Sequence, residues 1–331
     1  MQAHTSQSTV LALFFGLAAL APAVAQTYPS RPVTLVVPFG AGGPVDTLAR
    51  ILAERMKEPL GQNVLVETVT GASGSLGVGR VVRAPPDGYT VSIGNWPTHV
   101  VNGAIMTLPY DLLKDLEPVT LLAANPYVVV ARKDLPVATL PELIAWLKAN
   151  SDKATEGTGG PGSGQHVSGA YFQKVTGASF RFVPYRAGSV DIIRDMAGGH
   201  IDITFDQAIT ALGHVRAGTV KALAVTQKGR LAAAPDIPSV DEAGAPGVYI
   251  TTWTGLWLPA GTPKDIVAKL AAAARFALAD PAVARRLAEL GQEVFPVDQQ
   301  TPEGLAAFHK AEIEKWWPLI KAAGIRAEEA R

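Results

Sequence analysis

Short apolar runs alternate with longer segments of helical periodicity from residue 33 onward. In the first such pair, residues 33–38 form a short apolar run, and Leu48, Leu52 and Met56 recur at helical spacing within residues 45–60. A short apolar run is typical of a buried strand, and the 3–4 residue spacing is typical of an amphipathic helix. Repeated alternation of the two predicts an α/β fold with mainly parallel sheets flanked by helices.

The same criteria predict the other elements. Further strands are expected over residues 63–69, 89–93, 119–124, 127–131, 179–183, 201–205, 222–226, 251–258 and 293–296. Further helices are expected over residues 76–82, 140–149, 163–175, 189–197, 208–217, 264–279, 281–290 and 303–323. Asn125-Pro126 separates the predicted strands 119–124 and 127–131.

These elements divide into two sheets, which predicts a two-lobed molecule. No part of residues 126–226 has the composition of a flexible linker, so we expect strands to join the lobes. The two crossings are placed near residues 122–125 and 249–253. Lobe 1 then comprises residues 26–124 and 250–331, and lobe 2 comprises residues 125–249.

The N-terminal segment has the pattern of an export signal. Residues 1–30 contain no Lys, Arg, Asp or Glu, and an unbroken apolar run of twelve residues extends from Val10 to Ala21. Pro22 and then Ala23-Val24-Ala25 follow, a small-x-small pattern that signal peptidase accepts. Such a run is too short to cross a hydrocarbon core about 30 Å thick. We therefore expect residues 1–25 to be a signal peptide and the chain to be periplasmic; a buried N-terminal helix is the alternative.

Composition narrows the possible functions. The 331 residues carry 29 basic and 29 acidic side chains, so there is no basic excess to indicate nucleic-acid binding. Cysteine is absent, which excludes disulfides, thiolate zinc sites, iron–sulfur clusters and a cysteine nucleophile.

Three glycine-rich turns are candidate binding loops. They span residues 38–46, 70–77 and 158–166, each before a predicted helix. Unpaired backbone N–H groups at the positive end of a helix suit an anion, and glycine lets a ligand approach the backbone closely. One such turn alone is better explained as a tight connection, but three together indicate binding at the carboxyl ends of strands.

Two acidic residues accompany these turns. Asp46 lies in the first turn of its predicted helix, and Asp206 directly follows a predicted strand in the other lobe. Each can serve as a helix cap, or each can accept a hydrogen bond from an amine, amide or hydroxyl group of a ligand. Trp253, by contrast, is expected to serve in core or hinge packing.

Catalytic motifs are incomplete. Gly40-Ala41-Gly42 lacks the third glycine of a dinucleotide fingerprint because residue 45 is valine, and no Walker loop or H-E-x-x-H frame occurs. The turns around Ser73 and Ser163 each lack a glycine of the nucleophile elbow. An exported serine hydrolase using Ser73 or Ser163 remains the least favoured alternative.

An ordered set of short motifs follows the predicted signal peptide. It begins with residues 28–39, Gly42-Gly43-x-x-Asp46 and Ala49-Arg50. It continues through Gly71-Ala72-x-Gly74, Pro86-Asp87-Gly88-Tyr89-Thr90, Gly162-Ser163-x-x-His166, Val183-Pro184-Tyr185-Arg186, Trp253-Thr254-Gly255-Leu256 and Pro259-Ala260-Gly261-Thr262-Pro263. In this order the set resembles the Bug (TctC-like) family of periplasmic solute receptors of tripartite tricarboxylate transporters.

The resemblance implies a two-lobed, type II Venus-flytrap protein without enzymatic activity or cofactor. A small organic acid or amino acid would bind between the lobes, held by backbone amides and waters, and a membrane permease would receive it. No nucleic-acid partner is implied, and the chain is expected to be monomeric. A sensory receptor that closes on the same ligand is an alternative. By position, the ligand-binding residues would be Phe39, Gly42, Gly43, Asp46, Ala72, Ser73, Gly162, Ser163, His166 and Asp206.

Overall fold

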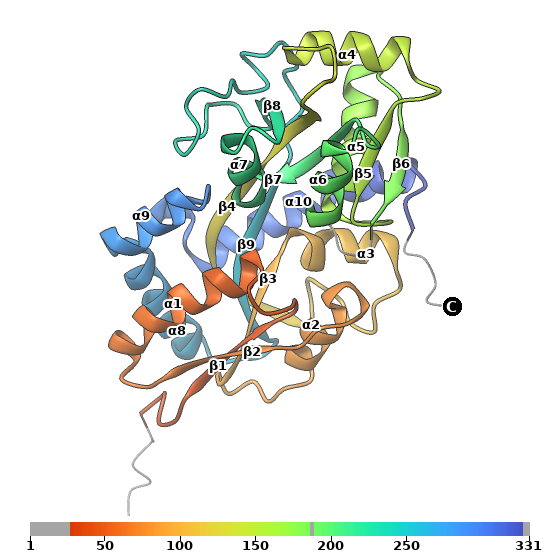
Figure 1. The fold of residues 1–331 in the computed structure, drawn as a ribbon. Coiled ribbons are helices and arrows are strands. Elements are labelled where there is room, and N and C mark those ends of the chain that lie inside the picture. Colours follow the sequence, from red (N-terminus) through yellow and green to blue (C-terminus); the bar gives the residue numbers. More distant parts are fainter. Residues whose placement is uncertain (1–26, 186–188, 327–331) are drawn as a thin grey trace, which may run out of the picture.

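A computed structural model describes residues 27–185 and 189–326 (Figure 1). The predicted signal peptide lies outside the described residues. The strands are β1 (Val33–Val37), β2 (Val64–Thr68), β3 (Thr90–Asn95), β4 (Leu116–Arg132), β5 (Thr155–Thr158), β6 (Arg181–Pro184), β7 (Ile203–Gln207), β8 (Val220–Val225), β9 (Thr251–Pro259) and β10 (Glu293–Val294).

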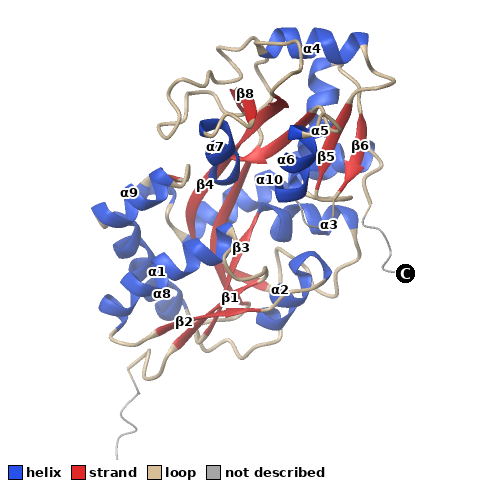
Figure 2. Cartoon of the chain, viewed as in Figure 1, coloured by secondary structure: helices blue, strands red, loops and turns tan. Residues whose placement is uncertain are grey.

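The helices lie on both sides of these strands (Figure 2). The α-helices are α1 (Pro44–Leu60), α2 (Ser75–Val82), α3 (Asn102–Ile105), α4 (Leu140–Ala149), α5 (Gly164–Thr176), α6 (Ser189–Ala197), α7 (Ala208–Arg216), α8 (Lys264–Ala279), α9 (Pro281–Glu289) and α10 (Pro302–Ala322). Short 3₁₀ turns occur at η1 (Ala72–Gly74) and η3 (Val297–Gln299), and η2 (Pro97–Val101) is a π-helical turn. No helix within the described ranges is both long enough and apolar enough to span a membrane.

The sheet has the order β2-β1-β3-β9-β4-β7-β5-β6, with β8 and β10 also paired to β4. The outer pairs β1–β2, β1–β3, β5–β6 and β5–β7 are parallel, as the alternating pattern predicts. The central strands β4 and β9 run antiparallel to each other and to their other neighbours. The result is a two-lobed α/β structure in which one mixed sheet curls from one lobe into the other.

Strand β4 is the main connection between the lobes. It is continuous through Asn125 and Pro126, where the sequence predicts a break. Pro126 is tolerated because β4 changes partners there: it pairs with β9 up to this point and with β7 and β8 beyond it. A residue without an N–H group causes least loss where one ladder ends and the next begins. The lobe boundaries proposed from the sequence remain a prediction.

A second difference concerns β5, which the sequence analysis does not include as a strand. Its sequence, Thr-Glu-Gly-Thr, shows neither an alternation of polar and apolar residues nor a continuous apolar run. Glu156 in this strand is fully buried. Parallel pairing with β6 and β7 overrides this weak local signal.

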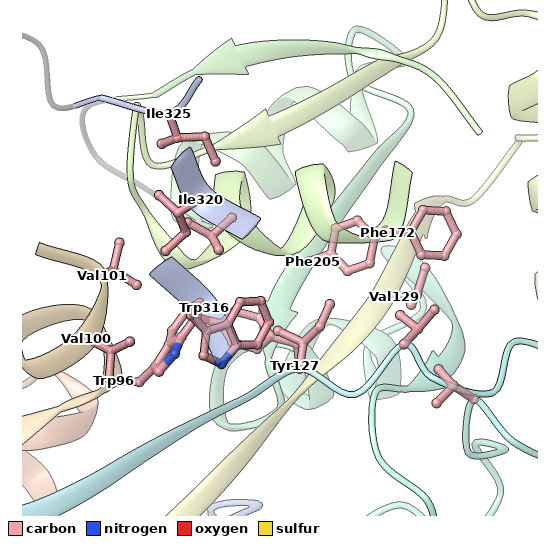
Figure 3. Close-up of a cluster of buried hydrophobic side chains, with 14 of the residues drawn as sticks. Trp96, Val100, Val101, Tyr127, Val129, Phe172, Phe205, Trp316, Ile320 and Ile325 are labelled. Carbon is pink, nitrogen blue, oxygen red and sulfur yellow. The ribbon is translucent and has the colours of Figure 1, made fainter. Parts of the chain in front are cut away.

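The C-terminal helix α10 packs across both lobes. Trp316 contacts Trp96 edge-on at 4.9 Å between ring centroids, and it contacts Tyr171 of α5 in the same manner at 5.1 Å. Figure 3 shows Trp316 and Ile320 within one apolar cluster that also includes Tyr127 of β4. Burial of these large side chains fixes α10 beside the strands that connect the lobes.

Candidate functional site

A cavity of about 250 Å³ lies where β1 and β3 end, beside the middle of β4 and the start of β9. Its walls come from four places in the chain: the first glycine turn with the start of α1, the end of β3, the paired strands β4 and β9, and residues beside β7 and β10. The lining residues are Phe39, Gly40, Gly43, Pro44, Val45, Asn95, Pro97, Ala123, Asn125, Gln207, Thr252, Trp253, Thr254 and Gln292.

The first glycine turn is held in shape by Asp46. One carboxylate oxygen, Oδ2, accepts the N–H of Gly42 at 2.8 Å and the Nε of Arg50 at 2.9 Å. The hydrogen bond from Arg50, and that from Gly42, hold the pKa of Asp46 below its ordinary value. Gly42 has a φ of +81°, which favours glycine. Asp46 therefore organises the turn through Gly42 and Arg50, and its contact with a ligand stays a prediction.

The start of α1 offers backbone donors to the cavity. Gly43 is the N-cap and makes no side-chain cap, and Pro44 occupies the first helical position, where no N–H is needed. The N–H groups of Val45 and Asp46 belong to the first turn and have no intrahelical acceptor. Because Val45 lines the cavity, the positive end of α1 faces it.

Opposite this turn, four uncharged polar side chains form what we call the polar wall: Asn125, Gln207, Thr252 and Gln292. Asn125 and Thr252 are directly paired across β4 and β9. The Nδ2 of Asn125 lies 3.4 Å from Oε1 of Gln207. Asn125 Oδ1, Thr252 Oγ1 and Gln292 Oε1 are buried and have no hydrogen-bond partner among the described residues.

Behind the cavity, η2 anchors Asn95. The amide Oδ1 of Asn95 accepts the N–H of Thr98 at 3.2 Å, and the hydroxyl of Thr98 lies 2.9 Å from Nδ1 of His99. The His99 ring stacks on Trp257 at 3.8 Å, and His309 Nε2 lies 2.6 Å from the His99 carbonyl oxygen. Burial lowers the pKa of both histidines, to about 4 for His309, so both are neutral near pH 7.

The second turn packs beside the first. A Cβ added to Gly74 would lie 3.2 Å from Cβ of Pro38, at the end of β1. Ala72 and Ser73 have φ of +45° and +53°, a conformation that costs a non-glycine residue about 1–2 kcal/mol. Nδ2 of Asn102 donates to the carbonyl oxygen of Ser73 at 2.9 Å and helps to hold this turn.

The third turn lies against α3. A Cβ added to Gly162 would lie 2.2 Å from Cδ1 of Ile105, so the turn is packed against the side chain of this α3 residue. The hydroxyl of Ser163 caps α5 by accepting the N–H of His166 at 3.2 Å, and His166 Nδ1 accepts the N–H of Gly162 at 3.2 Å. Burial lowers the pKa of His166.

Asp206 lies one residue before Gln207 of the polar wall and is itself outside the cavity lining. Its Oδ1 accepts the Ser189 hydroxyl at 2.8 Å and the N–H of Gln207 at 2.9 Å, while Oδ2 is buried without a partner in the described ranges. Burial raises the pKa of Asp206.

A larger cavity of about 460 Å³ lies between α5 and α10, but fewer of its lining residues have polar side chains than in the cavity of about 250 Å³. Its lining includes Tyr171, Phe182, Trp316 and Ile320 and is mainly apolar. None of its lining residues belongs to a glycine turn. The smaller cavity combines backbone donors with converging polar groups, which is what a site for a small polar ligand requires.

Sequence comparison identifies the chain. The profile of the family described as "Tripartite tricarboxylate transporter family receptor" (TctC) matches residues 48–325. The chain belongs to this TctC receptor family. Its solved relatives include the periplasmic binding protein BugD, 37% identical with a TM-score of 0.78, covering 90% of this chain and 99% of that one.

Two further relatives of the TctC receptor were solved with ligands. MatC from Rhodopseudomonas palustris with bound malate is 36% identical with a TM-score of 0.78, covering 88% of this chain and 100% of that one. R. palustris Rpa4515 with adipate is 34% identical with a TM-score of 0.80, covering 90% and 99%. The Bug/TctC resemblance and the two-lobed binding-protein fold are thereby confirmed.

The predicted site residues are distributed unevenly in this TctC receptor. Phe39 and Gly43 line the cavity, and Gly42 and Asp46 shape its rim. Ala72, Ser73, Gly162, Ser163, His166 and Asp206 lie outside the lining, so their contact with a ligand stays a prediction. Sequence reasoning missed the polar wall and assigned Trp253 to packing alone. The available signal was the pair of predicted strand crossings, near residues 122–125 and 249–253, which include Asn125 and Thr252.

The hydrolase alternative requires a base beside Ser73 or Ser163. Within the described ranges, neither the Ser73 nor the Ser163 hydroxyl is hydrogen-bonded to a histidine ring nitrogen, and the Ser163 oxygen accepts a backbone N–H instead. No group of three or more acidic or histidine side chains in the same ranges could hold a metal ion.

Proposed function

We propose that this receptor captures a small carboxylate in the cavity of about 250 Å³, with the carboxylate at the start of α1, and delivers it to a membrane permease. The observation that carries the proposal is the position of the cavity between the first turn of α1 and the polar wall. Helix N-termini stabilise anions through free N–H groups and the helix dipole, and buried unpartnered side-chain atoms on the opposite wall indicate a polar ligand.

The relatives support a carboxylate. MatC was solved with malate and Rpa4515 with adipate, and this receptor shares 36% and 34% identity with them. A cavity of about 250 Å³ lies just below the range of pockets for drug-sized ligands, which suits a smaller ligand.

Closure of the two lobes would complete the site. The third glycine turn approaches α3 through Gly162 and Ile105, and α3 also holds the second turn through Asn102 and Ser73. A ligand that contacts both sides would stabilise this closed arrangement over an open one. The closed form would be the form that a permease recognises. Export by residues 1–25, a periplasmic location and a monomeric receptor are parts of the same proposal.

A thermal-shift screen of residues 26–331 tests the proposal. The panel should contain monocarboxylates, dicarboxylates, tricarboxylates and amino acids, each with its matched carboxamide. A ligand at 100 times its dissociation constant stabilises the native state by about 2.7 kcal/mol. We expect at least one acid to raise the melting temperature by a few degrees and its amide to leave it unchanged. Equal shifts with acids and amides would contradict the role of the α1 N-terminus.

A further inference from the structure

The polar wall offers uncharged side-chain hydrogen-bonding groups, whereas the glycine turn and the start of α1 offer backbone N–H donors. Its four residues are brought together by strand pairing: Thr252 on β9 faces Asn125 on β4, Gln207 ends β7, and Gln292 precedes β10. The three residues with unpartnered oxygens have exposed fractions of only 5–6%. These oxygens are therefore buried acceptors on residues that line the cavity.

Buried acceptors without donors are costly. A buried polar atom left unpaired loses its hydrogen bonds to water, which is why native proteins pair nearly all of them. Asn125 Oδ1, Thr252 Oγ1 and Gln292 Oε1 are three such atoms on one wall. A ligand group that donates hydrogen bonds satisfies them. The carboxamides and the hydroxyl of the wall can also donate, so the matching group both donates and accepts.

A second carboxylate fits this wall poorly. An ionised carboxylate only accepts hydrogen bonds, so it supplies no proton to the three oxygens. None of the four wall side chains carries a positive charge to offset its loss of hydration.

From this geometry we infer that the ligand is a short carboxylic acid whose far end carries a neutral hydrogen-bonding group, a hydroxyl or a carboxamide, bound by Asn125, Thr252 and Gln292. The inference rests on the proposed function, because it takes the carboxylate to lie at the start of α1. It adds the chemical class of the second end of the ligand and the residues that select it.

A series of four-carbon acids that differ only at the far end provides the test. Butyrate, 4-hydroxybutyrate, succinamate and succinate present a methyl, a hydroxymethyl, a carboxamide and a second carboxylate. Affinities are measured by calorimetric titration of the folded chain, residues 26–331. One neutral hydrogen bond changes an equilibrium by up to about tenfold. We expect 4-hydroxybutyrate and succinamate to bind about tenfold more tightly than butyrate and succinate.

A pair of substitutions assigns the preference to the wall. Thr252→Val keeps the shape of the side chain and removes its unpartnered hydroxyl. We expect it to weaken 4-hydroxybutyrate or succinamate binding about fivefold and to leave butyrate binding unchanged. Ser92→Ala is the matched control, since Ser92 Oγ is also buried without a partner in the described ranges but lies outside the cavity lining. It should change none of the affinities.

Each result decides one claim. If butyrate or succinate binds as tightly as 4-hydroxybutyrate and succinamate, the inference is overturned while the carboxylate proposal stands. Equal weakening of butyrate and 4-hydroxybutyrate by Thr252→Val likewise overturns the assignment to the wall. If none of the four acids binds but another acid of the thermal-shift panel does, the inference is overturned and the proposed function stands. If no acid of either set binds a chain that is folded by circular dichroism, the proposed function fails and this inference with it.

Discussion

The indole Nε1 of Trp253 donates to Oε2 of Glu312 across 3.0 Å, which ties a wall residue of the cavity to α10. The same oxygen accepts Nε1 of Trp316 at 3.1 Å, and Trp316 contacts Tyr171 of α5. Burial raises the pKa of Glu312 despite these two hydrogen bonds. One carboxylate thus links the cavity of about 250 Å³ to the helix that packs across both lobes.

Replacing Glu312 should destabilise the protein and disturb the cavity wall. Glu312→Met removes the acceptor and leaves two buried indole N–H groups unpaired, at a cost of about 1–3 kcal/mol each. Urea unfolding, followed by tryptophan fluorescence, measures the loss. Glu314→Met is the control, because Glu314 is on the same helix and its side chain is 66% exposed. If the two variants were equally stable, the indole–carboxylate link would contribute nothing.

Removing one backbone donor at the start of α1 should weaken carboxylate binding. Val45→Pro deletes the N–H at the second helical position, where a helix has no acceptor for it, so α1 can persist. A charge-assisted hydrogen bond contributes about 1.5–3 kcal/mol, so affinity should fall at least tenfold. Val45→Ala loses side-chain packing but keeps the N–H, and calorimetry should find its affinity close to wild type. The same loss in both variants would show that packing, and not the donor, is responsible.

Gly162 should be far less tolerant of alanine than Gly160. Both have a positive φ, +76° and +94°, so both alanine variants incur similar backbone strain. Only at Gly162 would the new Cβ meet another group, Cδ1 of Ile105 at 2.2 Å; at Gly160 nothing lies within 4 Å. We expect Gly162→Ala to weaken ligand binding at least tenfold more than Gly160→Ala. Indistinguishable affinities would argue against closure through this contact.

The stability of the protein should depend on pH through Glu156. Both of its carboxyl oxygens are buried without a partner in the described ranges, and burial raises its pKa well above the ordinary value of 4.5. The native state therefore holds the proton more tightly than the unfolded state. This contribution is fully present below pH 4.5 and is lost as the pH rises through the native-state pKa, by up to about 1.4 kcal/mol per pH unit.

Glu156→Gln isolates that effect, because it resembles the protonated side chain at every pH. The free energy of urea unfolding, measured between pH 4 and 7, should fall with pH more steeply in wild type than in the variant. Parallel curves would mean that Glu156 titrates alike in the folded and unfolded states.

Local pattern was sufficient for most of the fold. The helices at Ser189–Ala197 and Lys264–Ala279 have the predicted bounds, because apolar periodicity is strong in both. The pattern failed where tertiary pairing overrides local preference. Pro126 predicts a break in the strand, but β4 continues because it changes partners there. Glu156 argues against a buried strand, because an acidic side chain is usually exposed, yet it is fully buried in the folded chain.

The candidate site was predictable only in its backbone part. The glycines and Asp46 predict the first turn, because the turn depends on glycine conformations and on the hydrogen bond from Gly42 to Asp46. The polar wall joins Asn125 with Thr252 and Gln292, which are far apart in sequence and meet through pairing with β4. Nothing in the local sequence distinguishes these buried polar residues from polar residues on the surface. Their role depends on which face of the strand meets the cavity.

The central claim is that the carboxylate group itself is recognised in this cavity. The most direct measurement is a calorimetric titration of residues 26–331 with the best acid of the screen and with its neutral carboxamide, which has nearly the same size and shape. The account predicts one binding site for the acid and at least tenfold weaker binding of the amide. Equal affinity for the acid and the amide would contradict it.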